Sequence, residues 1–365
     1  MSDTFLDKSA LQVNDGVEQP PIVNPNAVSR FKKFQQKIPS TSEFVEGILS
    51  KNITILSKAI TLVESSLPEH YALGQEIIER CLPCSGNSVR IGITGVPGAG
   101  KSSFIETFGK LLTSQGYRLA VLAIDPSSER SKGSILGDKT RMETLCADEN
   151  AFIRPSPSAG SLGGVARKTR ESLILCEAAG FDVVFIETVG VGQSETAVHS
   201  MVDFFLLLLI SGGGDELQGI KRGIMEMADL LAITKADGEN KMQAEQARIL
   251  YQSAMHFLPV PDSGWTPKTT TCSAKTNTGL NEIWDIISEY IKFVKANGYF
   301  KTNRLQQAKY WMYETINTYL RDSFYQNPVI KEKLAEFENA VLSDRLSSFT
   351  AAKQLFDIYE ANRKM

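Results

Sequence analysis

A glycine-rich run that ends in lysine and serine is the part of the sequence with the clearest chemistry. It is a complete GxxxxGK[ST] pattern made of Gly95, Val96, Pro97, Gly98, Ala99, Gly100, Lys101 and Ser102. An apolar stretch typical of a buried strand, 89–94, precedes it, and a helical pattern begins at Ser103, which we include among the nucleotide-binding residues. Glycines let backbone N–H groups turn towards phosphate oxygens, and a helix N-terminus favours negative charge. We therefore expect a phosphate-binding loop in which Lys101 contacts the β- and γ-phosphates and Ser102 binds Mg²⁺.

Two aspartates are candidates for the surroundings of the metal ion. Asp125 follows the apolar stretch 119–124, and Asp138 lies on a loop punctuated by glycine. In sheets built from such strands, ligands bind at the carboxyl ends of the strands. Asp125 is therefore expected to hold a metal-bound water or to orient the attacking water, although a helix cap or a turn is the other interpretation. Asp138 is a second candidate carboxylate near the metal.

An acidic residue followed three positions later by glycine is the usual arrangement for sensing a γ-phosphate. Here the acid is Glu187, at the end of the apolar stretch 183–187, and the glycine is Gly190. We expect Glu187 to contact Mg²⁺ through water and the Gly190 N–H to bind the phosphate. No glutamine directly follows Gly190, so the water-positioning residue of Ras-like GTPases is not visible and intrinsic hydrolysis is expected to be slow.

The bases that the site accepts are indicated by two later motifs. TKAD, at 234–237, is a variant of the guanine-reading NKxD in which Asp237 accepts the N1 and N2 protons of guanine and Lys235 lays its stem along the base. Thr234 replaces the usual asparagine, which is expected to weaken one supporting contact but leaves the discriminating carboxylate. A second run, Ser273, Ala274 and Lys275, matches the loop that offers a backbone N–H to guanine O6. Adenine presents a donor at that position and would leave the N–H unpaired, so the sequence predicts a site for GTP and GDP.

The motifs GVPGAGKS, IDPSS, SILGDKTRM, ETVGVGQSE, GDELQGIKRG, TKAD and SAKTNTGL, in this order, resemble those of the MeaB/ArgK-type P-loop GTPases. These proteins are the guanine-nucleotide partners of methylmalonyl-CoA mutase and of related cobalamin-dependent acyl-CoA mutases. The resemblance extends from about Phe44 to the C-terminal helical region. It implies hydrolysis of GTP to GDP and phosphate, a homodimer held largely by the C-terminal helices, and a chaperone that gates cobalamin loading and protects the mutase.

The resemblance also implies roles for individual residues. It supports Lys101 and Ser102 at the phosphates and Mg²⁺, and Asp237 with Ser273–Lys275 at the base. It places Asp125, Asp138 and Glu187 around the metal and the attacking water. The segment 212–223 resembles the loop that couples nucleotide state to the mutase; without the resemblance, an ordinary glycine-rich connection is the alternative.

Two other functions are weighed against this one. A GTPase that matures another cobalamin or metal enzyme is the first, but such proteins commonly carry His-rich tails or cysteine clusters beside the phosphate loop. Here the three histidines are scattered, and Cys81 and Cys84 precede the loop. A small-molecule kinase linked to amino-acid transport is the second, and no motif supplies its acceptor pocket and base. Cys81 and Cys84 are interpreted as small, half-buried residues before a strand.

The fold class follows from the stretches that are apolar throughout, because helices must cover both faces of a sheet made of such strands. These stretches are 89–94, 119–124, 183–187, 204–210 and 230–234. We expect an α/β P-loop NTPase with a mostly parallel, doubly wound sheet. A mobile arm (1–40) and N-terminal helices (41–86) precede the GTPase domain (87–296), and a C-terminal helical dimerisation region (297–365) follows it. The apolar stripes of the last region fit a small bundle or a second subunit, and the resemblance favours the subunit.

Composition limits the remaining classes. Of 365 residues, 42% are hydrophobic and 22% are charged, and the net charge is −3. These values exclude wholesale disorder and argue against a partner that is nucleic acid or a membrane surface. The longest apolar run, 204–210, is far shorter than the ~20 residues that span a bilayer. The N-terminus has no targeting pattern, so we expect a cytoplasmic protein.

Overall fold

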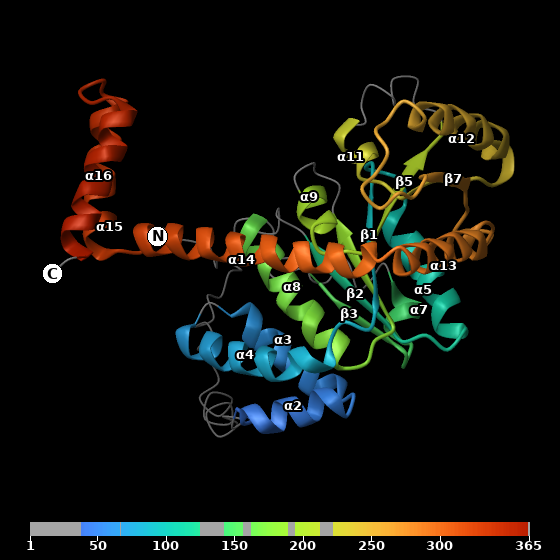
Figure 1. The fold of residues 1–365 in the computed structure, drawn as a ribbon, viewed down its shortest axis with the longest axis horizontal. Helices are drawn as coiled ribbons and strands as arrows, with labels where there is room; N and C mark the ends of the chain where they lie inside the picture. The colour runs from blue at the N-terminus through green and yellow to red at the C-terminus, as the bar shows by residue number, and fades with distance from the viewer. Residues whose placement is uncertain are drawn as a thin grey trace, which may run out of the picture. The chain divides into compact units, whose positions relative to one another are not determined.

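A parallel sheet of seven strands lies at the centre of the described residues (Figure 1). The computed structural model describes residues 38–65, 67–124, 142–155, 162–188, 194–211 and 222–363, of which those from Thr41 onwards belong to one compact unit. The strands are β1 (Val89–Gly95), β2 (Leu119–Ile124), β3 (Ala151–Arg154), β4 (Val183–Thr188), β5 (Phe204–Ile210), β6 (Leu230–Thr234) and β7 (Lys268–Thr271). Their order is β3-β2-β4-β1-β5-β6-β7, and each pairing between them is parallel. The predicted fold class is confirmed.

The five predicted strands agree with the structure to within one residue at each end, but two edge strands were not predicted. β3 and β7 have four residues each, and each pairs with a neighbour on one side only. β7 reads KTTT and has a single buried residue, Thr270. Both strands are short and β7 is polar as well, so neither has the long apolar run that marks strands buried on both faces.

Helices cover both faces of the sheet. On one face lie α5 (Lys101–Ser114), α7 (Glu143–Cys146) and α13 (Leu280–Ala296), and on the other lie α8 (Leu162–Ala178), α9 (Ser194–His199) and α12 (Lys241–Met255). Consecutive residues of one strand serve the two faces: Phe204 packs in the cluster with α5 and α13, and Phe205 packs in the cluster with α8 and α9. This alternation is the two-residue period of a strand.

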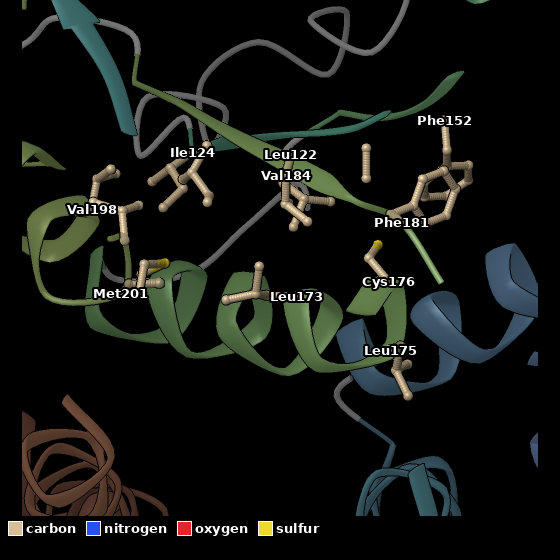
Figure 2. Close-up of a cluster of buried hydrophobic side chains, with 14 of the residues drawn as sticks. Leu122, Ile124, Phe152, Leu173, Leu175, Cys176, Phe181, Val184, Val198 and Met201 are labelled. Carbon is tan, nitrogen blue, oxygen red and sulfur yellow. The ribbon is translucent and has the colours of Figure 1, made fainter. Parts of the chain in front are cut away.

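Helix α8 is buried on two sides. Figure 2 shows Leu173 and Cys176 pointing towards Leu122 and Val184 of the sheet, whereas Leu175 points away from it. On that outer side lie the N-terminal helices α2 (Thr41–Leu49), α3 (Ile53–Glu64) and α4 (Pro68–Cys81), which pack against one another and against α8. The N-terminus of α3 is capped by Asn52, whose side chain accepts hydrogen bonds from the N–H groups of Thr54 and Ile55.

Three helices end the chain: α14 (Tyr299–Tyr325), α15 (Pro328–Leu342) and α16 (Ser348–Arg363). The first part of α14 packs against α13 and α8, and the last two helices pack on each other. Phe324, near the end of α14, stacks on Phe356 and contacts Tyr359 of α16. No helix of the described residues is long and apolar enough to cross a membrane, and all five cysteines are free thiols.

A buried ionic network joins the amino ends of the central strands to α8 and α14. Glu177 of α8, with no exposed side-chain surface, accepts hydrogen bonds from Nε and Nη2 of Arg90 at 2.8 Å and from the Ser88 hydroxyl at 2.6 Å. Arg304 of α14 pairs with Asp203 at 2.7 Å. Burial raises the pKa of Glu177, but the hydrogen bond and charge of Arg90, with Ser88 and Arg304, outweigh it and leave this pKa below its ordinary value.

The lowered pKa predicts a pH dependence of stability that Glu177→Gln removes. The ionised carboxylate stabilises the folded chain above its unfolded pKa of about 4.3, and this contribution is lost as pH falls through the lower folded value. The variant leaves Arg90 buried without its counter-charge and should lose about 3–5 kcal/mol at pH 7. Urea unfolding at pH 7 and below pH 4 measures the difference, with Glu76→Gln on the exposed surface of α4 as the control. An equal difference at both pH values would contradict the assignment.

Candidate functional site

The glycine-rich run links β1 to α5, as a phosphate-binding loop requires. Gly98 and Gly100 have φ values of 83° and 78°, a region in which residues with a Cβ are strained. A Cβ on Gly95 would lie 2.3 Å from the Leu208 carbonyl oxygen of β5, so the loop leaves the sheet where no side chain fits. Pro97 and Gly98 are exposed and Ala99 is buried. The backbone of this turn is therefore available to a ligand while its far end is anchored in the core.

Lys101 is held at the first turn of α5 with its ammonium group against the loop. Nζ donates to the Gly95 carbonyl at 2.9 Å. Burial lowers the pKa of Lys101, and the charges of Glu187 and Glu195 oppose that change. Lys101 and the Glu187 carboxylate thus lie close enough for their charges to interact. This is expected of two groups that bind the same phosphate and its metal ion.

Glu187 is aligned with the phosphate loop by the pairing of β1 and β4. Ile93 of β1 is its partner in the register, which makes Thr94 and Thr188 the next pair. The hydroxyls of these two threonines lie 2.7 Å apart, and both side chains are buried. Glu187 itself is half-buried. The bond fixes the end of β4 against the strand that carries the phosphate loop, and this contact had no signal in the sequence.

A cavity of about 310 Å³ adjoins the phosphate loop and is enclosed by both predicted base-binding loops. Its lining comprises Ala99, Gly100, Ser103, Phe104, Thr234, Lys235, Asp237, Cys272, Ser273, Ala274 and Lys275. Segments more than 170 positions apart in the chain thus meet at one place. Phe104 is a lining residue that the sequence did not indicate, because it reads as an ordinary core residue, whereas Cys272 directly precedes the predicted run 273–275.

The base-binding loops are fixed by hydrogen bonds to each other. The Ser273 hydroxyl donates to the Asp237 carboxylate at 2.5 Å, and the Ala236 N–H donates to the Cys272 carbonyl at 3.0 Å. Lys235 has a positive φ of 56°, and the Asn240 side chain holds its carbonyl at 2.7 Å. The Asp237 carboxylate therefore lines the cavity in a set position, which is what recognition of two donor groups on a base needs.

Thr234 joins the base-binding strand to the phosphate loop. Its buried hydroxyl lies 2.8 Å from the Ala99 carbonyl and 2.9 Å from the Leu209 carbonyl, and its one proton is shared between them. The sequence suggested that threonine in place of asparagine loses a supporting contact. The structure shows that the threonine makes a contact of its own with the phosphate loop.

Three predicted site residues, Asp125, Asp138 and Gly190, lie outside the described residues. Of the remaining predicted residues, Ser102 is half-buried in the first turn of α5, directly after Lys101. Among the residues that the structure describes, no group of three or more histidine, cysteine, aspartate or glutamate side chains is placed to hold a metal ion. Mg²⁺ is commonly bound through one or two protein groups together with phosphate oxygens and water, and Ser102 and Glu187 are of that kind.

Comparisons with known proteins find a matching family model and similar relatives. The family model described as "Methylmalonyl Co-A mutase-associated GTPase MeaB" matches residues 56–329. The chain is 46% identical to "GTPase ArgK" of Escherichia coli over 305 residues, which covers 84% of this chain and 92% of that one. It is also 46% identical to the "Methylmalonic aciduria type A homolog, mitochondrial" of Mus musculus over 325 residues, 86% of this chain and 78% of the relative.

A solved structure has the same fold. The protein, described as "LAO/AO transport system kinase", is 38% identical, superimposes with a TM-score of 0.69, and covers 89% of this chain and 100% of its own. Its described name is a kinase, whereas the two curated relatives just given carry the names of a GTPase and of a methylmalonic aciduria protein.

Thr234→Val tests the hydroxyl that links the two halves of the site. The variant keeps the shape of the side chain and removes a hydrogen bond worth about 0.5–1.5 kcal/mol, so GDP should bind about 3- to 10-fold more weakly. Thr234→Ser retains the hydroxyl and should bind GDP nearly as tightly as the native chain. Titration calorimetry with GDP measures both affinities. Equal affinities of the valine and serine variants would show that the hydroxyl does not support the site.

Proposed function

The chain belongs to the family of methylmalonyl-CoA mutase-associated GTPases, and on this premise we propose that its GTP hydrolysis gates cobalamin loading into a partner mutase and protects that mutase. The chain is a GTPase associated with methylmalonyl-CoA mutase. The observation that carries the proposal is the cavity in which the phosphate loop meets both base-binding loops. A site with these three parts holds a complete guanine nucleotide, and such a nucleotide can serve as a switch.

The proposed roles at the phosphates follow from position and charge. Lys101, in the first turn of α5, binds the β- and γ-phosphates in exchange for its bond to Gly95. Ser102 and Glu187 hold Mg²⁺, which neutralises phosphate charge when bound, Glu187 through water. Asp125 and Asp138 are proposed near the metal and the attacking water, and Gly190 at the γ-phosphate. The chain's own groups thus bind and orient the reacting phosphate.

The proposed roles at the base rest on the loops that line the cavity. Asp237 accepts the N1 and N2 protons of guanine, and Lys235 lies along the base. The run Ser273–Lys275 offers a backbone N–H to O6. Because Ser273 also holds the Asp237 carboxylate, the two loops act on the base as one rigid unit.

We further propose that the chain is a homodimer formed largely through its C-terminal helices. Several large apolar side chains of α14 expose more than half of their surface: Leu305, Met312, Tyr313, Leu320 and Tyr325. Phe349 of α16 and Leu342 of α15 are more than 80% exposed. We expect a protein–protein contact to cover exposed apolar side chains of this size and number.

We also propose a division of the chain into four parts. Residues 41–86 are N-terminal helices, 87–296 the GTPase domain and 297–365 the dimerisation region. The predicted arm, 1–40, lies outside the described residues except for 38–40. The predicted coupling segment lies largely outside the described residues, at 212–221. We propose a cytoplasmic location for this chain, whereas the mouse relative is named mitochondrial.

Steady-state phosphate release by the purified chain, with and without the methylmalonyl-CoA mutase of its host, tests the proposed function. GTP should be hydrolysed and ATP should not, and the mutase should raise the GTP rate by about fivefold or more, as expected for two coupled sites. Lys101→Ala, which removes the only lysine of the loop, is the control for hydrolysis by this site. GTP turnover that is indifferent to the mutase would contradict the proposed partner but not the site. Absence of GTP turnover would contradict both.

A further inference from the structure

Three side chains on one face of α14 bind the segment that follows α9. Arg304 donates from Nε and Nη2 to the two Asp203 carboxylate oxygens at 2.8 and 2.7 Å. Gln307 donates from Nε2 to the Val202 carbonyl at 2.6 Å, and Trp311 donates from its indole nitrogen to the Ser200 carbonyl at 3.1 Å. Gln307 and Trp311 are only 5% and 7% exposed, although the rest of α14 is largely open to solvent. These contacts are therefore a specific attachment rather than incidental surface bonds.

The bound segment continues directly from α9 and closes the end of that helix. The N–H groups of Ser200 and Met201 donate to the carbonyls of Thr196 and Val198, and the Ser200 hydroxyl donates to the Ala197 carbonyl at 2.7 Å. Figure 2 shows Val198 and Met201 facing the interior cluster under the sheet. The Ser200 carbonyl that Trp311 binds thus belongs to a residue held by α9, and the Val202 carbonyl that Gln307 binds lies two positions further along the same segment.

Close packing at β1 makes this unit sensitive to small displacements. A Cβ on Gly92 would lie 2.8 Å from Val198 and 3.1 Å from Val202, so α9 and its following segment rest directly on the backbone of β1. Packed interfaces of this kind shift between discrete arrangements rather than deforming smoothly. Gln307 and Trp311 bind carbonyls of the same segment and would register such a shift.

The other end of α9 is close in sequence to the γ-phosphate. α9 begins at Ser194, six positions after Thr188, the last residue of β4. Thr188 is fixed to Thr94 beside the phosphate loop, so the start of this connection is anchored at the nucleotide site. Only five residues separate Thr188 from the start of α9. A change of backbone position near the γ-phosphate is therefore expected to displace α9.

We propose that Gln307 and Trp311 are positioning residues that hold the end of α9, and that through them α14 senses whether GTP or GDP is bound. The inference rests on the proposed role of Glu187 and Gly190 at the γ-phosphate. The same helix carries the exposed apolar side chains assigned above to the second copy of the chain. The hydrogen bonds of Gln307 and Trp311 therefore connect the bound nucleotide to the contact between copies. Because such coupling is reciprocal, the contact between copies also changes the relative affinity for GTP and GDP.

The chain supplies its own probe, because Trp311 is one of only three tryptophans. In a chain with Trp265→Phe and Trp284→Phe, the fluorescence of Trp311 should differ between the complex with GDP and the complex with Mg²⁺ and a non-hydrolysable GTP analogue. A chain that retains only Trp284, which packs on Tyr117 at the far face of the sheet, is the control and should show no difference. Binding of both nucleotides is measured separately with fluorescent analogues. Identical Trp311 emission in two occupied states would overturn the inference alone, whereas failure of either nucleotide to bind would overturn the proposed function as well.

Substitutions at two neighbouring glutamines distinguish a positioning role from a general effect on the stability of α14. Gln307→Met retains the length of the buried side chain but cannot donate, whereas Gln306→Met alters the exposed neighbour. Gln307→Met should lower kcat for GTP about 3- to 10-fold, the equivalent of one lost hydrogen bond, with KM and GDP affinity within about twofold of the native values. Gln306→Met should leave kcat and KM unchanged. Equal kcat values for the two variants, or an effect of Gln307→Met on KM alone, would contradict the proposal.

Discussion

Parallel pairing of β1 with β4 and β5 is the constraint on which the nucleotide site depends. It places the ends of three buried strands at one edge, where Gly95, Thr188 and Ile210 leave the sheet. The continued parallel order of β6 and β7 brings the two base-binding loops to the same edge. Strand pairing alone thus brings together residues that lie more than a hundred positions apart in the chain. Hydrogen bonds between the loops, such as that from Thr234 to Ala99, then adjust a geometry that the sheet has already set.

The amino ends of the strands, at the opposite side of the sheet, stabilise the fold. There the carboxylates of Glu177 and Asp203 hold Arg90 and Arg304, and these bonds attach α14 to the amino ends of the strands. Arg304, Gln307 and Trp311 continue this attachment along one face of α14 towards α9. One helix therefore reaches from the amino ends of the strands to α9, the helix that follows the segment proposed to bind the γ-phosphate. This arrangement can convert a local change at the phosphate into a change at a distant surface, since both ends of the connection are firmly held.

The sequence predicts the fold well where a physical pattern lies within one element, and poorly where a bond joins two elements. The five central strands are visible because each is apolar throughout, and the glycine-rich run is visible because Gly98 and Gly100 require positive φ. The strand β7 is missed because Lys268 and its threonines resemble a loop. The Thr94–Thr188 pair and the partners of Thr234 cannot be predicted, because they depend on strand register and on which residues the fold brings together. For the same reason Gln307 and Trp311 read simply as helix residues.

The central claim is that Asp237 makes this site selective for guanine, and calorimetric titration of the native chain and of Asp237→Asn with GDP and ADP tests it most directly. The native chain should bind one GDP per chain and prefer it to ADP by about 100-fold or more, because the pocket's polar groups are unpaired beside adenine. In Asp237→Asn the carboxylate can no longer accept both guanine protons, and most of that preference should disappear. A native preference for GDP that survives unchanged in Asp237→Asn would contradict the assignment of the base-binding loops.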